Sequence, residues 1–263
     1  MIANYHTHTF RCGHAGDYAD EEYVIAAIEN GFQIMGFTDH TPWPYDTGFQ
    51  EPRVRMHQDK LPEYIGSVRA LQEKYKDQIH IYLGMECEYF PKYLPWLQEQ
   101  KKKMDYLILG NHYRLNNEDG GIYFGRSSKP QDVIDYVTFT VEGMKTGMFS
   151  YLAHPDIVFR SYPSFDETSR EWSYILCQNA KELDMPLEYN LLGLQRWDSG
   201  EYQQMGYPLP QFWEIAAQVG CKAIVGLDAH SPQHYGQKER IARVEGHLES
   251  LGMEIVETLP GLE

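Results

Sequence analysis

The run Ile2-Ala3-Asn4-Tyr5-His6-Thr7-His8 is a short β-like stretch that ends in two histidines spaced two residues apart. Alternate side chains of a strand point to the same face, so His6 and His8 would lie side by side. Strand-like runs that end in a histidine recur at Thr38-Asp39-His40, Gly110-Asn111-His112, Ala153-His154-Pro155-Asp156 and Asp228-Ala229-His230. The stretch Gly84-Met85-Glu86 places a carboxylate in the same kind of position. This recurrence decides the prediction of the fold.

Strand-like and helix-like stretches alternate along the chain. Short apolar runs predict strands at 2–8, 33–38, 79–89, 106–110, 149–153, 186–190 and 223–227. Apolar residues at helical spacing predict helices at 20–31, 61–75, 93–103, 131–148, 169–183, 210–219 and 238–251. Long polar loops are expected at 42–58, 114–130, 156–168 and 191–209.

Seven strands that alternate with helices indicate either a parallel barrel or a doubly wound sheet. In an open sheet, reactive groups gather at one switch point. In a barrel, they come from the carboxyl ends of many strands and converge on one mouth. Six of the seven predicted strands end at a histidine or glutamate, and the 186–190 strand offers only Glu188 and Asn190. We therefore predict one α/β domain over residues 1–263, a TIM-barrel-like structure of seven βα units with its site at the carboxyl ends of the strands.

Charge and composition narrow the function. The chain of 263 residues has 23 basic and 38 acidic residues, a formal net charge of −15. This argues against broad nucleic-acid binding, which depends on basic surface, but not against a small anionic substrate at a metal site. The four cysteines have no CxxC spacing, and we find no signal peptide and no apolar run of about 20 residues. We expect a reduced cytoplasmic protein without a membrane partner.

Imidazoles and carboxylates from many strand ends are the donors that a multi-metal hydrolytic site requires. A single histidine after a strand is more often an ordinary core residue, but five such motifs together predict a polynuclear site. Asp39 is either a ligand or an outer partner that fixes a ligand tautomer. Glu86 is favoured over Glu88 as the ligand because it directly follows the Gly84-Met85 pair. The remaining histidines are expected to be solvated or structural: His57, His80, His234 and His247.

The motifs HxH, TDH, GxE, NH, HPD and DxH occur in this order between His6 and His230, with His14 after the first. In this they resemble the polymerase and histidinol phosphatase (PHP) family of metal-dependent phosphoesterases. The resemblance implies a distorted (β/α)7 barrel and three divalent ions, for which mixed histidine and carboxylate ligands suit Zn, Mn or Fe. The implied ligands are His6, His8, Glu86 and Asp228 for the first ion, Glu86, His112 and His154 for the second, and His14, His40 and His230 for the third.

Within the family, the stretches GMECEYFP (84–91), GNHY (110–113) and AHPD (153–156) are similar to members that hydrolyse L-histidinol phosphate to L-histidinol and phosphate in histidine biosynthesis. The hypothesis is in-line attack on phosphorus by a hydroxide shared between the first two ions. Asp228, His230 and a metal-bound water are the catalytic candidates for handling the leaving-group proton, and the sequence does not choose among them.

Arg160 and Arg196 are candidate phosphate-binding residues, because guanidinium groups bind phosphate bidentately. The alternatives are a phosphatase for another small phosphomonoester, such as a nucleotide or sugar phosphate, a nuclease, or a non-catalytic metal-binding module. The sequence gives no indication of the oligomeric state.

Overall fold

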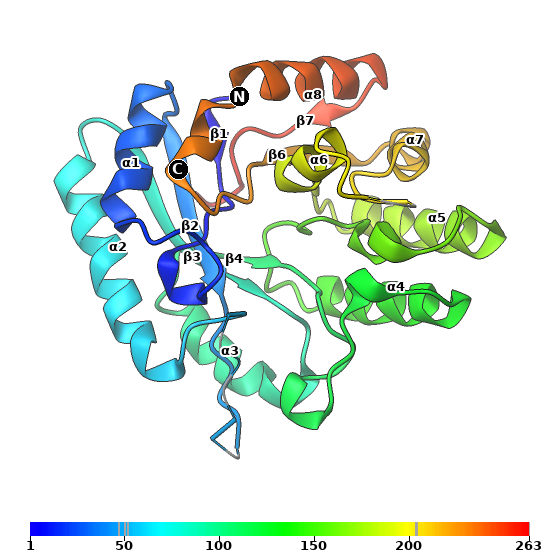
Figure 1. Ribbon diagram of the computed structural model, residues 1–263, viewed down its shortest axis with the longest axis horizontal. Coiled ribbons are helices and arrows are strands. Elements are labelled where there is room, and N and C mark those ends of the chain that lie inside the picture. The colour runs from blue at the N-terminus through cyan, green and yellow to red at the C-terminus, as the bar shows by residue number, and fades with distance from the viewer. Residues whose placement is uncertain (47, 50, 52, 203–204, 263) are drawn as a thin grey trace.

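A computed structural model describes residues 1–46, 48–49, 51, 53–202 and 205–262. Parallel strands curl into a half-barrel that helices cover on its outer face (Figure 1). The first sheet has the order β1-β2-β3-β4 and the second β5-β6-β7. The strands are β1 (Ala3–Asn4), β2 (Ile34–His40), β3 (His80–Cys87), β4 (Tyr106–Leu109), β5 (Leu187–Asn190), β6 (Lys222–Gly226) and β7 (Glu254–Ile255).

Helices follow the strands as the alternating pattern predicts. They are α1 (Asp20–Glu29), α2 (Leu61–Tyr75), α3 (Leu94–Lys101), α4 (Pro130–Lys145), α5 (Glu167–Glu182), α6 (Leu191–Asp198), α7 (Pro210–Val219) and α8 (Lys238–Ser250). Local chemistry sets their ends. The side chain of Asp166 caps α5 by accepting from the backbone N–H of Ser169, and Gly220 ends α7 in the left-handed conformation with φ 81°.

Several sequence predictions differ from the structure: β7 was not predicted, β1 is shorter than the strand predicted at 2–8, and two further differences lie close to the site. The segment predicted as a strand at 149–153 hydrogen-bonds to β4 and β5 through its backbone, but its regular pairings are limited to Leu152 with Leu109 and Leu187. The chain leaves the sheet there because the next residue, His154, has a φ of 29°, which does not continue a strand. The loop predicted at 191–209 contains α6, which begins directly after β5. The Asn190 side chain starts this helix by accepting from the backbone N–H of Gly193 at 2.8 Å.

Isolated parallel pairings connect the two sheets. Leu152 lies between β4 and β5, and Thr7, after β1, pairs with Ala229, after β6. Backbone hydrogen bonds support this second pairing, from the N–H of His8 to the Ala229 carbonyl at 2.8 Å and from the N–H of Ala229 to the His6 carbonyl at 3.0 Å. Motifs from the two ends of the chain therefore meet.

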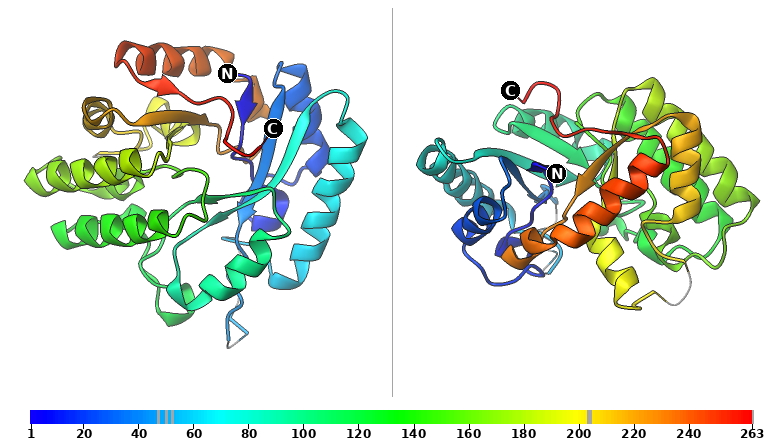
Figure 2. Two further views of the ribbon diagram at one scale, coloured as in Figure 1. Left: turned by 180° about the vertical axis from the view of Figure 1, so that it is seen from behind. Right: turned by 90° about the horizontal axis from the view of Figure 1, so that it is seen from above.

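A separate apolar cluster fills the end of the curled sheet where the strands begin. The C-terminal segment contributes Leu259 and Leu262, which pack with side chains of the first strands, and the N- and C-termini lie near each other (Figure 2). The Tyr106 side chain occupies space left by Gly36, and its hydroxyl donates a hydrogen bond to the Tyr5 carbonyl at 2.6 Å. With this end packed, the open end is the one where the strands finish.

The four cysteines are free and buried. No helix in the described part of the chain is long and apolar enough to cross a membrane.

Candidate metal centre

Glu86 is the centre of the histidine cluster. It lies near the end of β3 with 1% of its surface exposed and pairs in register with His40 on β2. One carboxylate oxygen, Oε1, lies 2.8 Å from Nε2 of His154 and 3.4 Å from Nε2 of His112. The other, Oε2, lies 2.9 Å from Nδ1 of His40. Three strand ends thus present imidazoles to a single carboxylate.

His6 and His8 point to the same side, as their spacing predicts. Their Nε2 atoms are 3.1 Å apart, and Oδ1 of Asp228 lies 3.5 Å from the first and 3.2 Å from the second. Oε2 of Glu86 faces the same two nitrogens at 3.7 and 3.5 Å. These four side chains form one compact donor group.

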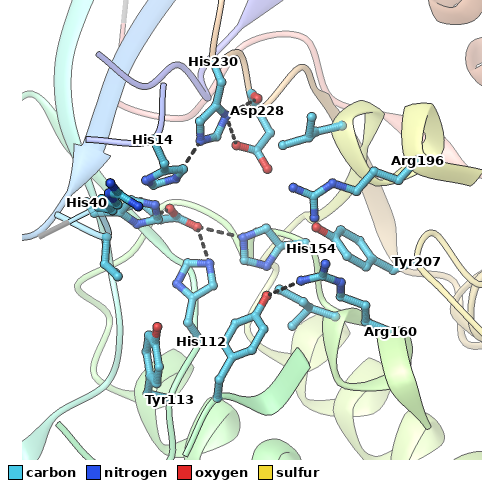
Figure 3. Close-up of a pocket in the computed structure, with 16 residues that line it drawn as sticks. His14, His40, His112, Tyr113, His154, Arg160, Arg196, Tyr207, Asp228 and His230 are labelled. Atoms are coloured by element: carbon cyan, nitrogen blue, oxygen red, sulfur yellow. Dashed lines mark hydrogen bonds and ion pairs between the residues drawn. The ribbon is translucent and has the colours of Figure 1, made fainter. Parts of the chain in front are cut away.

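The outer part of the cluster joins three more histidines. The Nε2 atoms of His14 and His230 are 3.0 Å apart, and a ligand atom of His40 lies within 4.8 Å of ligand atoms of His8 and His230. Figure 3 shows His14 and His230 facing each other beside His40. The structure therefore brings together all nine residues predicted as metal ligands.

Three of the imidazoles have a carboxylate near Nδ1, while their Nε2 atoms face the cluster. Glu188 lies 2.7 Å from Nδ1 of His6, Glu88 lies 3.4 Å from Nδ1 of His112, and Asp39 lies 3.6 Å from Nδ1 of His8. A carboxylate that hydrogen-bonds the second ring nitrogen fixes the ring and the tautomer of a metal-binding histidine, and the Glu188–His6 contact at 2.7 Å is such a hydrogen bond. The sequence prediction missed the role of Glu188, although its position on the one strand without a ligand was a usable signal.

Two glycines leave room for these buried carboxylates. A Cβ atom on Gly110 would lie 2.1 Å from Oε1 of Glu86, and one on Gly226 would lie 1.9 Å from Oε1 of Glu188. Two ligand positions also have positive φ, 29° at His154 and 49° at Asp228. Strained backbone of this kind is concentrated at functional sites.

The donor chemistry fits divalent cations. Oε2 of Glu86 is buried and makes no hydrogen bond among the described residues, although three imidazoles surround it. Burial raises the pKa of Glu86, but the neighbouring histidines, led by His112 and His40, outweigh it and bring the pKa well below its ordinary value. Burial lowers the pKa of His40 and of His230 well below the ordinary value, which favours the neutral imidazole, the form that can bind a metal ion. Oxygen and imidazole donors of this kind suit Zn, Mn or Fe.

A cavity of about 350 Å³ opens onto the cluster. Arg160 and Arg196 form its opposite wall and reach toward the histidines (Figure 3). Arg160 donates to the Tyr123 hydroxyl at 3.3 Å, and Glu201 lies 3.3 Å from Arg160 and 3.8 Å from Arg196. The lining residues that the sequence did not single out include Arg53, Tyr123, Leu192 and Tyr207.

The PHP domain model matches residues 4–190. A protein of Deinococcus radiodurans described as "Probable histidinol-phosphatase" is 26% identical over 243 residues, which cover 89% of this chain and 88% of that protein. A "Histidinol-phosphatase" of Bacillus subtilis is 22% identical over 258 residues, covering 88% and 94%.

Solved structures show the same fold. The histidinol phosphate phosphatase of Lactococcus lactis, crystallised with zinc, L-histidinol and phosphate, has a TM-score of 0.74 and 17% identity, covering 100% of this chain and 98% of that one. A putative histidinol phosphatase of Listeria monocytogenes has a TM-score of 0.73 and 19% identity, covering 89% and 97%. With the family match over most of the chain and all the expected motifs gathered in one site, this chain belongs to the PHP domain family.

Proposed function

We propose that this protein is a metal-dependent phosphomonoesterase that hydrolyses L-histidinol phosphate to L-histidinol and phosphate. The observation that carries the proposal is a single cavity with a Glu86-centred ligand cluster on one wall and two arginines, Arg160 and Arg196, on the other. A dianionic phosphate placed between them is neutralised from both sides. The names of the relatives in Deinococcus and Bacillus support histidinol phosphate as the substrate.

The donor groups divide into three proposed ion sites. His6, His8, Glu86 and Asp228 would hold the first ion, Glu86, His112 and His154 the second, and His14, His40 and His230 the third. Such ions supply an activated water and neutralise charge on the phosphate oxygens. Zinc is the ion in the Lactococcus lactis structure, and the donor set suits Mn and Fe as well.

The protein's own residues would orient the substrate and handle protons. Arg160 and Arg196 would each hold phosphate oxygens through paired N–H donors. Asp228 and His230 line the cavity beside the ligands, and Nδ1 of His230 lies 2.9 Å from the Asp228 carbonyl oxygen. This contact with the Asp228 backbone fixes the His230 ring. Asp228 and His230 are the proposed catalytic residues that would position a water in the cavity, and this water would supply the proton to the leaving alkoxide.

We infer a closed, distorted (β/α)7 barrel as the frame of the site. The supporting observations are the isolated pairings through Leu152 and between Thr7 and Ala229, which bridge the two gaps between the sheets. The whole of residues 1–263 would form this one domain, because the C-terminal segment packs under the first strands.

The identity of the alcohol part of the substrate is tested by comparison with other phosphomonoesters. Steady-state hydrolysis of L-histidinol phosphate should therefore be compared with nucleotide and sugar phosphates, with the metal content measured on the same sample. We expect a clearly higher kcat/KM for L-histidinol phosphate and about three ions per chain. Equal, weak activity on all compounds would reject histidinol phosphate as the substrate.

Substitutions of proposed ligands test the metal site independently of the identity of the substrate. His8→Ala and Glu86→Ala should abolish turnover while the protein still folds, because each removes a proposed ligand. His57→Ala is the matched control, since His57 is an exposed histidine that pairs with Asp59. Near-normal turnover by both ligand variants would reject the assigned site.

A further inference from the structure

Arg55 and Glu88 form a buried ion pair directly behind one proposed metal ligand. Nη2 of Arg55 lies 2.9 Å from Oε1 of Glu88, and Nη1 lies 3.1 Å from Oε2. The two residues are 5% and 1% exposed. Isolated charges are costly to bury, and breaking such a pair from one side is strongly destabilising. The proposed reaction assigns no role to either residue.

The pair reaches the metal cluster through His112. Nδ1 of this ring lies 3.4 Å from Oε1 of Glu88, and Nε2 lies 3.4 Å from Oε1 of Glu86. A neutral imidazole has one N–H and one lone pair. If Nε2 is to bind a cation beside Glu86, the hydrogen must be on Nδ1 and therefore face Glu88.

The surroundings of Glu88 leave it only the role of acceptor. Trp43 donates its indole N–H to Oε2 at 2.8 Å, and Arg55 donates to both oxygens. Neither an indole nor a guanidinium has a hydrogen-bond acceptor. A carboxylate held by these donors can accept from Nδ1–H of His112 but has no hydrogen to offer it.

Arg55 is itself fixed from two further sides. Its Nη1 donates to the Thr41 carbonyl at 2.9 Å, and its Nε donates to Glu51 at 2.6 Å. The residues just before it, Arg53 and Val54, line the substrate cavity. The Arg55 guanidinium therefore links the loop of Arg53 and Val54, at the cavity wall, to the Glu88 carboxylate beside His112.

We propose that Glu88 is a positioning residue that holds His112 as the Nδ1–H tautomer with Nε2 free to bind metal, and that Arg55 locks Glu88 in place. This inference rests on the metal site of the proposed function, and its tests read the ligand and the metal rather than turnover.

The first test needs no change to the ion pair. ¹⁵N NMR of the zinc-loaded protein, with the His112 signals assigned by comparison with His112→Asn, reports which ring nitrogen carries the hydrogen. We expect Nδ1–H on His112 with Nε2 bound to zinc. A His112 ring protonated on Nε2 would overturn the proposal. Failure of the wild-type protein to bind zinc would overturn the proposed function together with it.

The second test removes both charges at once. In Arg55→Met/Glu88→Met the pair is replaced by apolar side chains, a change that folded proteins often tolerate, while Nδ1 of His112 loses its acceptor. We expect chelator competition to show one zinc equivalent bound about 10- to 100-fold more weakly, with the others unchanged. Arg69→Met/Asp105→Asn, which removes an ion pair of the same types at 2.7 Å, should leave zinc affinity unchanged.

A third variant covers the case in which the double variant does not fold. Arg55→Lys keeps the positive charge but loses the paired donors, so we expect a smaller weakening of the same single zinc equivalent. Wild-type zinc affinity in a folded Arg55→Met/Glu88→Met protein, or in Arg55→Lys, would refute the positioning role while leaving the metal site intact.

Discussion

Gly110→Ala tests whether the position of the Glu86 carboxylate controls the site. The added Cβ would lie 2.1 Å from Oε1 and 2.6 Å from Cδ of Glu86. Non-bonded carbon contacts are favourable at about 3.5 Å or more, so the carboxylate must retreat by about 1 Å. Gly110 is not among the described residues with positive φ, so the change adds bulk without left-handed backbone strain.

The displacement is large on the scale of metal coordination, where ligand distances hold within about 0.2 Å. We expect loss of the ions that share Glu86 and a fall in kcat/KM of at least about 100-fold, as for other misplacements of about 1 Å. Overpacking adds a cost of about 1–3 kcal/mol in the free energy of unfolding. The assays are metal analysis after dialysis, steady-state kinetics and urea unfolding.

Gly66→Ala is the matched control, because a Cβ there meets nothing within 4 Å inside α2. It should keep its metals and gain about 0.5–1 kcal/mol of stability, as glycine is a poor helix former. A Gly110→Ala protein with a full metal complement and kcat/KM within about twofold of wild type would refute the reasoning, because a loss of about 100-fold is expected.

Three further predictions concern pH, phosphate and metal. Burial raises the pKa of Asp156 from 3.8 to about 7. As the pH rises from about 4 to about 7, the carboxyl ionises in the unfolded chain before it does in the native state, so the native state loses stability. Relative to Asp156→Asn, the free energy of unfolding of the metal-free wild type in urea should fall by about 4 kcal/mol over this range, and an equal pH dependence in the two proteins would contradict this. Glu201 pairs with Arg160 and Arg196, the proposed phosphate-binding residues. Glu201→Gln should therefore lower the inhibition constant of inorganic phosphate about two- to fivefold, whereas Arg160→Met should raise it. Chelation should lower the Tm and added zinc should restore it, because ions that bind only the native state stabilise it; an unchanged Tm in calorimetry would argue against a bound ion.

The sequence predicted the alternation of strands and helices and the nine residues that the structure gathers in the cluster around Glu86, most of them from local spacing. His6 and His8 share a face by the period of a strand. The motif at Asp228 ends another strand, and parallel strands in one barrel finish on the same side. The family resemblance then supplied the grouping of the ligands, which spacing alone left open.

Local patterns were less informative where the tertiary structure competes with them. The segment 149–153 hydrogen-bonds to β4 and β5, but only Leu152 forms regular pairings, and His154 then turns the chain out of the sheet. The helix after β5 was predicted as a loop, although Asn190 is a good helix cap. Closure of the barrel and the count of ions stay predictions.

The sequence by itself determined which residues are the proposed ligands, because residue type and strand spacing are both visible in short motifs. Only the tertiary structure decided which residues contact these side chains on the side away from the cavity and which residues face them across it. The contacts of Glu188 with His6, of Arg55 with Glu88, and of Glu201 with Arg160 join residues 182, 33 and 41 positions apart. Contacts between distant segments of this kind depend on how the strands curl and the loops pack, and no local periodicity encodes them.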